Sequence, residues 1–147
     1  EMVEMAAALG SDTAFFIENR VQLCTGRGEI MQPIDLDLSG LWLVVIKPPF
    51  GVSTAEAYSG VRPALPARSL AERLADDRST WQEKIVNGFE PHIFAAHPRL
   101  AELKQTLLDA GALYAAMSGS GSALFGLYER KPSVEFAEDI FVHIQQL

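Results

Sequence analysis

Ala115-Ala116-Met117-Ser118-Gly119-Ser120-Gly121-Ser122-Ala123-Leu124-Phe125 is the stretch around which this chain is organised. Apolar residues on both sides predict two antiparallel strands, and the Ser/Gly segment predicts the turn that joins them. Such a turn has almost no side chain between its backbone and a ligand, so several N–H groups can bind one anion. Because Gly and Ser also dominate ordinary turns, a flexible hairpin is the alternative interpretation.

Upstream of this hairpin, the apolar pattern predicts a helix and a strand. Four leucines with i, i+3, i+7 and i+8 spacing predict an amphipathic helix between Pro98 and Gly111. The continuous apolar run at residues 41–46 predicts a central strand covered on both faces. Ser53 and Glu56 then form a capping-box pattern, which predicts a helix directly after that strand.

The segment between these elements predicts short, broken helices. Capping-box patterns begin at Ser69 and, overlapping one another, at Ser79 and Thr80. Residues 89–96 predict one more helical piece. The connector at residues 62–66 contains two prolines and cannot be helical throughout.

Both ends of the chain predict smaller elements. We expect helices over residues 1–9 and 13–17 and an antiparallel hairpin over residues 21–34. Near the other end, residues 134–138 predict a short helix or turn, and residues 140–144 predict a last strand.

The composition is that of one globular domain with a proper core, since 48% of the 147 residues are apolar and 21% are charged. A net charge of -7 argues against a nucleic-acid partner or an anionic membrane surface, because either would need a basic face. Cys24 is the single cysteine and no Cys/His cluster has zinc spacing, so we expect a reducing, cytoplasmic compartment and no structural metal. No membrane span or signal peptide is predicted. The start at Glu1, without an initiator Met, suggests a piece of a longer protein.

A second stretch, Leu9-Gly10-Ser11-Asp12-Thr13-Ala14-Phe15-Phe16, places an acid between a glycine and an apolar run. Asp is an ordinary N-cap residue, whose carboxylate accepts an N–H that would otherwise be unpaired at a helix start. On the residues alone, the cap is the favoured interpretation of Asp12.

Four segments resemble one family, in matching order: Leu9-Gly10-Ser11-Asp12, Thr25-Gly26-Arg27-Gly28-Glu29-Ile30, Lys47-Pro48 with Val52-Ser53-Thr54-Ala55-Glu56-Ala57-Tyr58, and Met117-Ser118-Gly119-Ser120-Gly121-Ser122. They resemble the GHMP small-molecule kinases and, among these, the 4-diphosphocytidyl-2-C-methyl-D-erythritol kinases. The resemblance covers essentially the whole chain. The Ser/Gly loop alone is typical of any GHMP kinase, whereas the first three segments together indicate this particular kinase.

The resemblance implies an α+β fold in two parts. Residues 37–147 would form the GHMP kinase C-terminal domain, a ferredoxin-like antiparallel sheet with helices on one face. Residues 1–36, a helix and a hairpin, would be the tail of the N-terminal domain. The glycine-rich loop that wraps the ATP phosphates would belong to the missing N-terminal domain, so the fragment alone is expected to be inactive. Exposed apolar surface on residues 1–36 would favour self-association.

The implied reaction transfers the γ-phosphoryl of ATP, with Mg²⁺, to the 2-hydroxyl of 4-diphosphocytidyl-2-C-methyl-D-erythritol, a small-molecule substrate of the non-mevalonate isoprenoid route. Asp12 matches the acid that orients and deprotonates this hydroxyl. Thr54 matches a hydroxyl position beside the substrate, and Tyr58 matches an aromatic that stacks on the cytosine ring. Gly119, Ser120 and Gly121 match the third GHMP motif, which supports the ATP site. The resemblance implies no protein metal ligand in this chain.

Some positions depart from the family pattern or match nothing catalytic in it. Asn87-Gly88-Phe89-Glu90 resembles the Asn-Asp-x-Glu segment of the family, but Gly88 replaces the acid, so we assign this segment no chemistry. His92, His97 and His143 are interpreted as surface or packing residues.

Two other hypotheses stay open at this point. A GHMP kinase of the homoserine or mevalonate type would share the Ser/Gly loop, but not the pairing of TGRGEI with VSTAEAY. A non-catalytic α/β ligand-binding module would use Asp12 as a helix cap and Tyr58 as a half-buried core aromatic.

Overall fold

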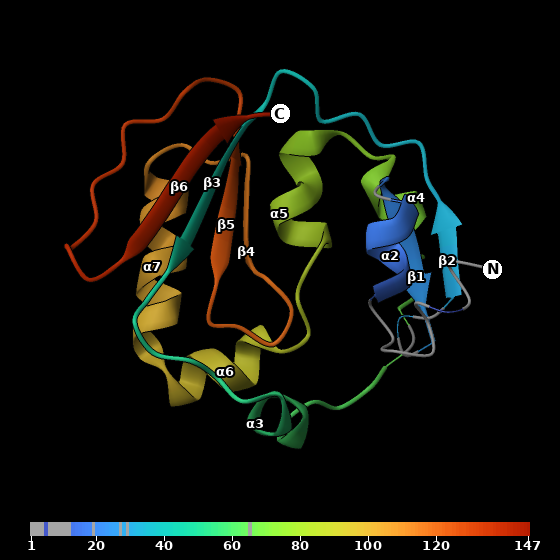
Figure 1. Ribbon diagram of the computed structural model, residues 1–147, viewed down its shortest axis with the longest axis horizontal. Helices are drawn as coiled ribbons and strands as arrows, with labels where there is room; N and C mark the ends of the chain where they lie inside the picture. The colour runs from blue at the N-terminus through green and yellow to red at the C-terminus, as the bar shows by residue number, and fades with distance from the viewer. Residues whose placement is uncertain (1–4, 6–12, 19, 27, 29, 65) are drawn as a thin grey trace. The chain divides into compact units, whose positions relative to one another are not determined.

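A computed structural model describes residues 5, 13–18, 20–26, 28, 30–64 and 66–147. The chain divides into two compact units, Glu1–Asp37 and Leu38–Leu147, and Figure 1 labels the helices and strands of each. The helix predicted over residues 1–9, the proposed cap at Asp12 and the hairpin tip at Arg27 lie outside the described residues, apart from Met5.

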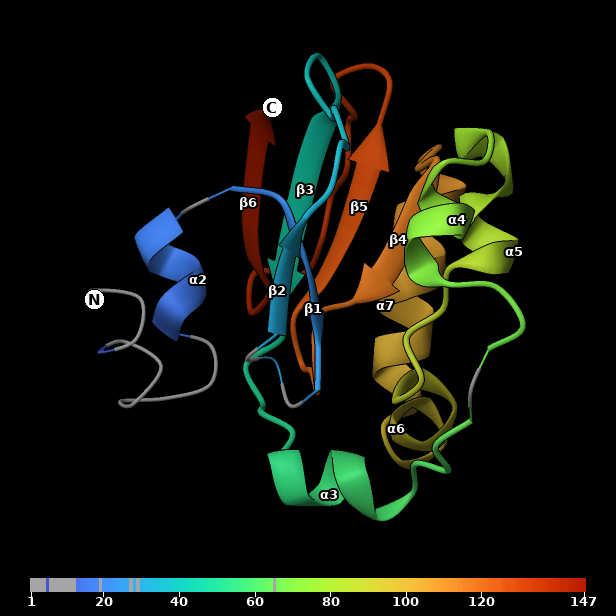
Figure 2. The same ribbon diagram turned by 90° about the vertical axis from the view of Figure 1, so that its right-hand side faces the viewer.

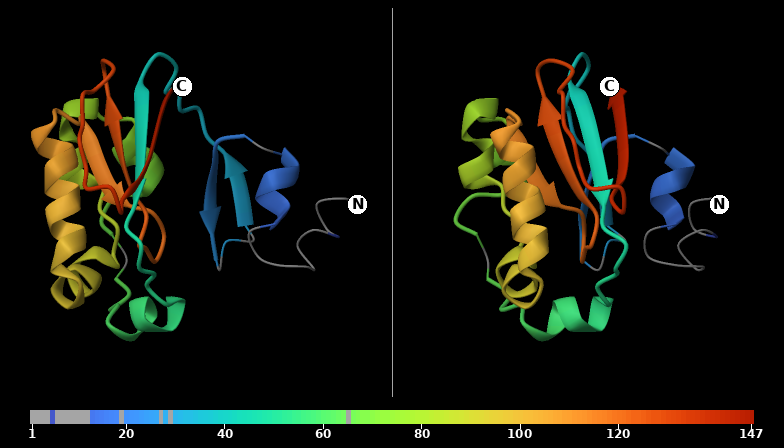
Figure 3. Two further views of the ribbon diagram at one scale, coloured as in Figure 1. Left: turned by 60° about the vertical axis from the view of Figure 1, so that its left-hand side comes forward. Right: turned by 90° about the vertical axis from the view of Figure 1, so that its left-hand side faces the viewer.

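The first unit contains one described short helix and one hairpin. These elements are α2 (Thr13–Glu18), β1 (Gln22–Thr25) and β2 (Ile30–Pro33). The two strands pair antiparallel, from Gln22 opposite Pro33 to Thr25 opposite Ile30 (Figure 3). This hairpin and the helix after Asp12 were predicted and are confirmed.

Several apolar side chains of this unit are exposed, which confirms the expectation of apolar surface. They are Phe16, Ile17, Val21 and Ile30, with exposed fractions between 44% and 71%. A two-stranded hairpin alone is marginal in water, because it has no second layer to bury such side chains.

The second unit is built on a four-stranded antiparallel sheet. Its elements are β3 (Trp42–Lys47), α3 (Thr54–Ser59), α4 (Leu70–Leu74), the 3₁₀ turn η1 (Arg78–Thr80), α5 (Trp81–Lys84), α6 (Glu90–Ala96), α7 (Pro98–Asp109), β4 (Tyr114–Met117), β5 (Leu124–Tyr128) and β6 (Phe141–Gln146). The strand order is β4-β5-β3-β6, and every neighbouring pair is antiparallel. Helices α6 and α7 lie on one face of the sheet (Figure 2). The predicted ferredoxin-like sheet with helices on one face is confirmed.

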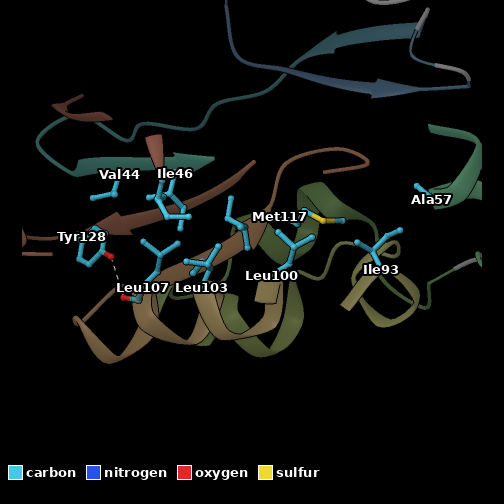
Figure 4. Close-up of a cluster of buried hydrophobic side chains, with 12 residues drawn as sticks. Val44, Ile46, Ala57, Ile93, Leu100, Leu103, Leu107, Met117 and Tyr128 are labelled. Carbon is cyan, nitrogen blue, oxygen red and sulfur yellow. Dashed lines mark hydrogen bonds between the residues drawn. The ribbon is translucent and has the colours of Figure 1, made fainter. Parts of the chain in front are cut away.

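The core lies between α7 and the sheet (Figure 4). Leu100 and Leu107 on α7 and Val44 and Ile46 on β3 are fully buried. Each such side chain contributes roughly 1.5–3 kcal/mol to folding. The amphipathic helix predicted from the leucine spacing is therefore confirmed, with its apolar stripe against the sheet.

Strand β3 is central, as predicted, since it pairs with β5 on one side and β6 on the other. Its two faces differ, however: Val44 and Ile46 are buried, whereas Leu43 and Val45 are half-buried. The expectation of a strand covered on both faces was therefore wrong for the face that carries Leu43 and Val45, which is only partly covered. Continuous apolar residues cannot distinguish a strand with two helical layers from one whose second face is partly open.

The capping box predicted at Ser69 is confirmed, whereas those predicted at Ser79 and Thr80 are wrong. Ser69 Oγ accepts from the N–H of Glu72, and Glu72 Oε2 accepts from the N–H of Ser69 at 2.7 Å. At Ser79 the hydroxyl instead donates to Asp77, whose carboxylate also accepts the Ser79 N–H at 2.9 Å. Thr80 precedes α5 without a side-chain cap. The Asp77 carboxylate therefore takes the place of the predicted Ser79 cap, while the Thr80 hydroxyl donates to the main-chain carbonyl of Asp77 at 2.8 Å.

Residues 134–138 form no helix, which corrects one of the two predicted alternatives, and a turn follows at residues 138–139. Val134 and Phe136 pack against the core, while Glu135 between them is exposed. This period of two is that of an extended segment, and core packing outweighs any local helical tendency. Strand β6 then ends the chain, as predicted.

None of the helices in the described ranges has both the length and the apolar character needed to cross a lipid bilayer.

Candidate functional site

Segments far apart in the sequence meet at one end of the four-stranded sheet, where α3, α6 and the β4–β5 loop lie (Figure 1). Ser122 Oγ in this loop donates to the carbonyl oxygen of Phe50, in the connection between β3 and α3. Asn87, just before α6, reaches Gly119 in the same loop. The structure thus places α3, the segment 87–90 and the Ser/Gly loop in one contact network.

Helix α3 starts at the predicted cap but uses only half of the predicted capping box. Ser53 Oγ accepts from the N–H of Glu56 at 3.1 Å. The Glu56 carboxylate does not return to Ser53; its Oε1 lies 2.7 Å from Nε2 of His97. Glu56 therefore connects α3 to the start of α7, although the local pattern predicts that it caps α3.

Thr54 and Tyr58, the two predicted substrate-binding residues, both lie on α3 and are both exposed. The Tyr58 side chain is 65% exposed and meets Phe89 edge to face, with ring centroids 4.9 Å apart. An amphipathic ring that is held on one side and open on the other is suited to stacking on a ligand. The alternative of a half-buried core aromatic is wrong for Tyr58.

The Ser/Gly loop closes as a tight turn. The N–H of Gly121 donates to the carbonyl of Ser118 at 3.0 Å, and the N–H of Ser118 donates to Ala123 at 2.9 Å. Gly119 has φ +54°, a left-handed conformation that other residues rarely adopt. Within the part of the chain that the structure describes, no hydrogen bond to the N–H groups of Gly119 and Ser120 is found. These two donors suit an anion.

Gly121 is needed for space as well as for backbone conformation. Its φ is +92°, and a Cβ there would lie 2.8 Å from Met117 Sδ and 3.6 Å from Val52 Cγ2. At Gly119 a Cβ would meet no atom within 4 Å, so this side of the loop is open. The loop is thus packed at Gly121 and accessible at Gly119.

Sequence reasoning missed two residues at this end of the sheet, Asn87 and Glu90. Nδ2 of Asn87 donates to the carbonyl oxygens of Met117 and Gly119, each at 2.8 Å. Glu90 Oε1 accepts from the N–H of Met117 at 2.8 Å. The resemblance of segment 87–90 to a family motif is the available signal, although Gly88 replaces the acid of that motif.

Glu90 is 7% exposed, and its charge is balanced within the fold. Its Oε2 accepts from Nζ of Lys104 on α7 at 2.6 Å. Removing one partner of a buried pair leaves an uncompensated charge, at a cost of about 3–5 kcal/mol. Burial, with a smaller contribution from Glu90, raises the pKa of the nearby Tyr114 to about 12.

The histidines have structural surroundings. His97 stacks on Phe50 with ring centroids 5.6 Å apart. His92 packs over Gly60, where a Cβ would lie 2.0 Å from the imidazole. His143 is exposed on β6 and bonds Gln145.

Comparison with known proteins identifies the family to which these site segments belong. Residues 62–143, more than half of the chain, match the family model "GHMP kinases C terminal". The chain belongs to the GHMP kinase family. The matched range of this GHMP kinase contains both the segment 87–90 and the Ser/Gly loop.

Relatives of this GHMP kinase are named 4-diphosphocytidyl-2-C-methyl-D-erythritol kinase. One from Parabacteroides distasonis is 47% identical over 130 residues, which is 88% of this chain and 48% of the relative. One from Porphyromonas gingivalis is 43% identical over 139 residues, which is 93% of this chain and 51% of the relative. The chain therefore spans about half the length of the curated relatives it matches.

Two solved structures resemble the GHMP kinase fold described above. A crystal structure of 4-(cytidine 5'-diphospho)-2C-methyl-D-erythritol kinase matches with a TM-score of 0.68 and 31% identity, over 86% of this chain and 47% of that one. Homoserine kinase from Cytophaga hutchinsonii matches with a TM-score of 0.60 and 20% identity, over 86% of this chain and 48% of that one. The second likeness shows the fold alone.

Asp12, the predicted catalytic residue of this GHMP kinase chain, lies outside the described residues. Among the residues that are described, no cluster of three or more His, Cys, Asp or Glu side chains could hold a metal ion. A shallow hollow lined by Gly111, Leu113, Tyr128 and Lys131 lies at the opposite end of the β4–β5 hairpin from the Ser/Gly loop, and it contains none of the predicted site residues.

Proposed function

We propose that this chain is the C-terminal part of a kinase that transfers the γ-phosphoryl of ATP to the 2-hydroxyl of 4-diphosphocytidyl-2-C-methyl-D-erythritol. The observation that carries the proposal is the 47% and 43% identity to relatives named for this kinase, over about nine-tenths of the chain. The reaction belongs to the whole, cytoplasmic protein. The chain alone would be inactive, because it spans about half of those relatives.

Tyr58 and Thr54 are proposed to bind the alcohol substrate. The Tyr58 ring is exposed and steadied by Phe89, so it can stack on a cytosine base with little loss of side-chain freedom. Thr54, on the same exposed helix, offers its hydroxyl within one helical turn of Tyr58. Stacking and a hydrogen bond together would select a cytidyl group over a smaller alcohol.

Gly119, Ser120 and Gly121 are proposed to support the ATP site. Two N–H groups without a partner among the described residues, on a loop open at Gly119, supply the kind of donors that a phosphate oxygen needs. Mg²⁺ would neutralise phosphate charge and would be bound chiefly through ATP, since no described cluster of acids could hold it.

Asp12 is proposed as the base that orients and deprotonates the attacking hydroxyl. Phosphoryl transfer needs little covalent chemistry from the protein, so a carboxylate at the nucleophile and positioned phosphates account for most of the catalysis. The match of the LGSD stretch to the family acid supports this role.

Residues 1–36 are proposed to be the end of the N-terminal domain, and residues 37–147 the C-terminal domain. The hairpin of β1 and β2 has no further strand partner among the described residues, and its apolar side chains are exposed. Both features suit a segment whose sheet continues in the missing half. Without that half, the same apolar surface would favour self-association.

The test is an assay of the full-length protein with ATP and each of three alcohols: 4-diphosphocytidyl-2-C-methyl-D-erythritol, homoserine and mevalonate. We expect phosphorylation of the first, with kcat/KM at least about a hundredfold above the other two. Preference for homoserine or mevalonate would replace this substrate assignment by another GHMP activity. ATP binding without phosphorylation of any of the three would contradict it.

A further inference from the structure

Side chains take the place of a neighbouring strand along the open edge of β4. This strand is at the end of the sheet order β4-β5-β3-β6. Gln82 Oε1 accepts from the N–H of Ala115 at 2.8 Å, Glu90 Oε1 accepts from the N–H of Met117, and Asn87 donates to the Met117 carbonyl. Among these three side chains, Asn87 also reaches beyond the strand into the Ser/Gly loop.

The contact of Asn87 with Gly119 decides which way one peptide group faces. In a trans peptide the C=O of one residue and the N–H of the next point in opposite directions. With the carbonyl of Gly119 held by Asn87 at 2.8 Å, the N–H of Ser120 is turned away from Asn87. This is the central peptide of the turn closed by Ser118 and Gly121, and its orientation distinguishes one turn type from another. A flip of this peptide changes ψ of Gly119, which glycine tolerates, and φ of Ser120, and the Asn87 contact favours the orientation observed.

Asn87 itself is held in place from both sides. Its Oδ1 accepts from the N–H of Phe89 at 2.9 Å, so the oxygen and both N–H groups of the side-chain amide are used. Three residues further on, Glu90 joins the same segment to Met117 and to Lys104 on α7. An aspartate at position 87 could not replace it, because a carboxylate would present only acceptors to two carbonyl oxygens.

We infer that Asn87 is a positioning residue for ATP binding. By holding the Gly119 carbonyl it directs the Ser120 N–H outward, as a donor for the ATP site. The inference rests on the proposed function, because it takes the Ser/Gly loop to be part of that site. It deepens the proposal by assigning a role to a residue that acts through the Gly119 carbonyl.

The test compares two amide-to-acid variants of the full-length protein, Asn87→Asp and, as the matched control, Gln82→Glu. Gln82 acts only as an acceptor toward Ala115, so glutamate can keep that bond. Dissociation constants for ATP and for the cytidyl-diphosphate alcohol are measured by calorimetry, together with the thermal midpoint. We expect Asn87→Asp to raise the dissociation constant for ATP about tenfold or more, as for a lost hydrogen bond to a charged group. The dissociation constant for the alcohol should rise by less than about threefold. Gln82→Glu should change both by less than about threefold.

Equal, small changes in ATP affinity for both variants would overturn the inference, even if both lower the thermal midpoint. If Asn87→Asp does not fold, Asn87→Ala decides: a tenfold loss of ATP affinity supports the inference and an unchanged affinity overturns it. A wild-type protein that binds ATP but phosphorylates none of the three alcohols contradicts the proposed function, while the role of Asn87 is still judged from the ATP constants. A wild-type protein that binds no ATP overturns both.

Discussion

His97 Nε2 lies 2.7 Å from Glu56 Oε1, and this contact joins the residue before α7 to the first turn of α3. The His97 ring also stacks on Phe50, in the connection that leads from β3 to α3. Both contacts hold the helix that carries Thr54 and Tyr58 against the rest of the unit. The position of the proposed substrate site thus depends on a histidine with no chemical role of its own.

His97→Ala should therefore lower the stability of the full-length protein by about 1–2 kcal/mol, through the lost hydrogen bond and ring contact. Because α3 is loosened, KM for the alcohol should rise more than KM for ATP. The control is His143→Ala, which removes an exposed histidine on β6 that bonds only its neighbour Gln145. Urea denaturation and steady-state kinetics measure both effects. Indistinguishable behaviour of the two variants would contradict the structural role of His97.

The two glycines of the Ser/Gly loop should respond differently to alanine. Gly121→Ala meets both a left-handed φ of +92° and a Cβ position 2.8 Å from Met117 Sδ. Gly119→Ala has the φ penalty alone, about 1–2 kcal/mol, because its Cβ enters open space. We expect Gly121→Ala to lose more stability in denaturant titrations. A larger loss at Gly119 would show that the loop is packed differently.

Stability should fall in alkaline solution because of buried tyrosines. Burial raises the pKa of Tyr128 to about 12, above the value of about 10 for an unfolded tyrosine. The folded state then binds more protons than the unfolded state, so this stabilisation is complete below about pH 10 and is lost as the pH rises toward 12. The same argument applies to Tyr114, because burial raises its pKa to about 12 as well.

Tyr128→Phe should reduce this alkaline loss, by about 1 kcal/mol near pH 11. It should also cost about 1 kcal/mol at neutral pH, because the Tyr128 hydroxyl donates to the carbonyl of Leu107 at 3.0 Å. The wild-type protein, measured alongside, gives the reference slope. The slopes come from denaturation at about pH 8 and about pH 11. An unaltered slope in Tyr128→Phe would refute this assignment.

Tyr58 should act through its ring rather than its hydroxyl. In the full-length protein, Tyr58→Ala should raise KM for the cytidyl-diphosphate alcohol about tenfold, the value of a lost stacking contact, and leave KM for ATP within about twofold. Tyr58→Phe keeps the ring and should stay close to wild type. If Phe is as damaging as Ala, stacking is not the role of this side chain.

The parts of the fold that could be predicted are those with a repeating local pattern. The leucine spacing of α7 predicts both the helix and its buried face, and the apolar runs of β3 and β5 predict the strands. Tertiary contacts decide the structure of the segments whose local pattern predicts something else. Val134 and Phe136 are drawn into the core as extended chain, and Asp77 takes the Ser79 hydroxyl that local patterning had assigned to a cap.

The site was predictable where the residue type itself carries the chemistry. A tyrosine on a helix and a Ser/Gly turn between strands could be predicted from the sequence, and the structure brings their segments to one end of the sheet. Asn87 and Glu90 were not predictable in this way. Each bonds backbone atoms of Met117, 30 and 27 residues away, and backbone atoms leave no signature in residue type.

The proposed reaction depends most on Asp12, the residue assigned as its base. The direct measurement is single-turnover phosphoryl transfer by full-length Asp12→Asn, with substrate and ATP affinities measured alongside. We predict that the rate falls about a thousandfold while both dissociation constants change less than about threefold, as expected for loss of a base. A variant that keeps its rate within about tenfold, and merely loses about 1 kcal/mol of stability, would show a helix cap instead and contradict the account.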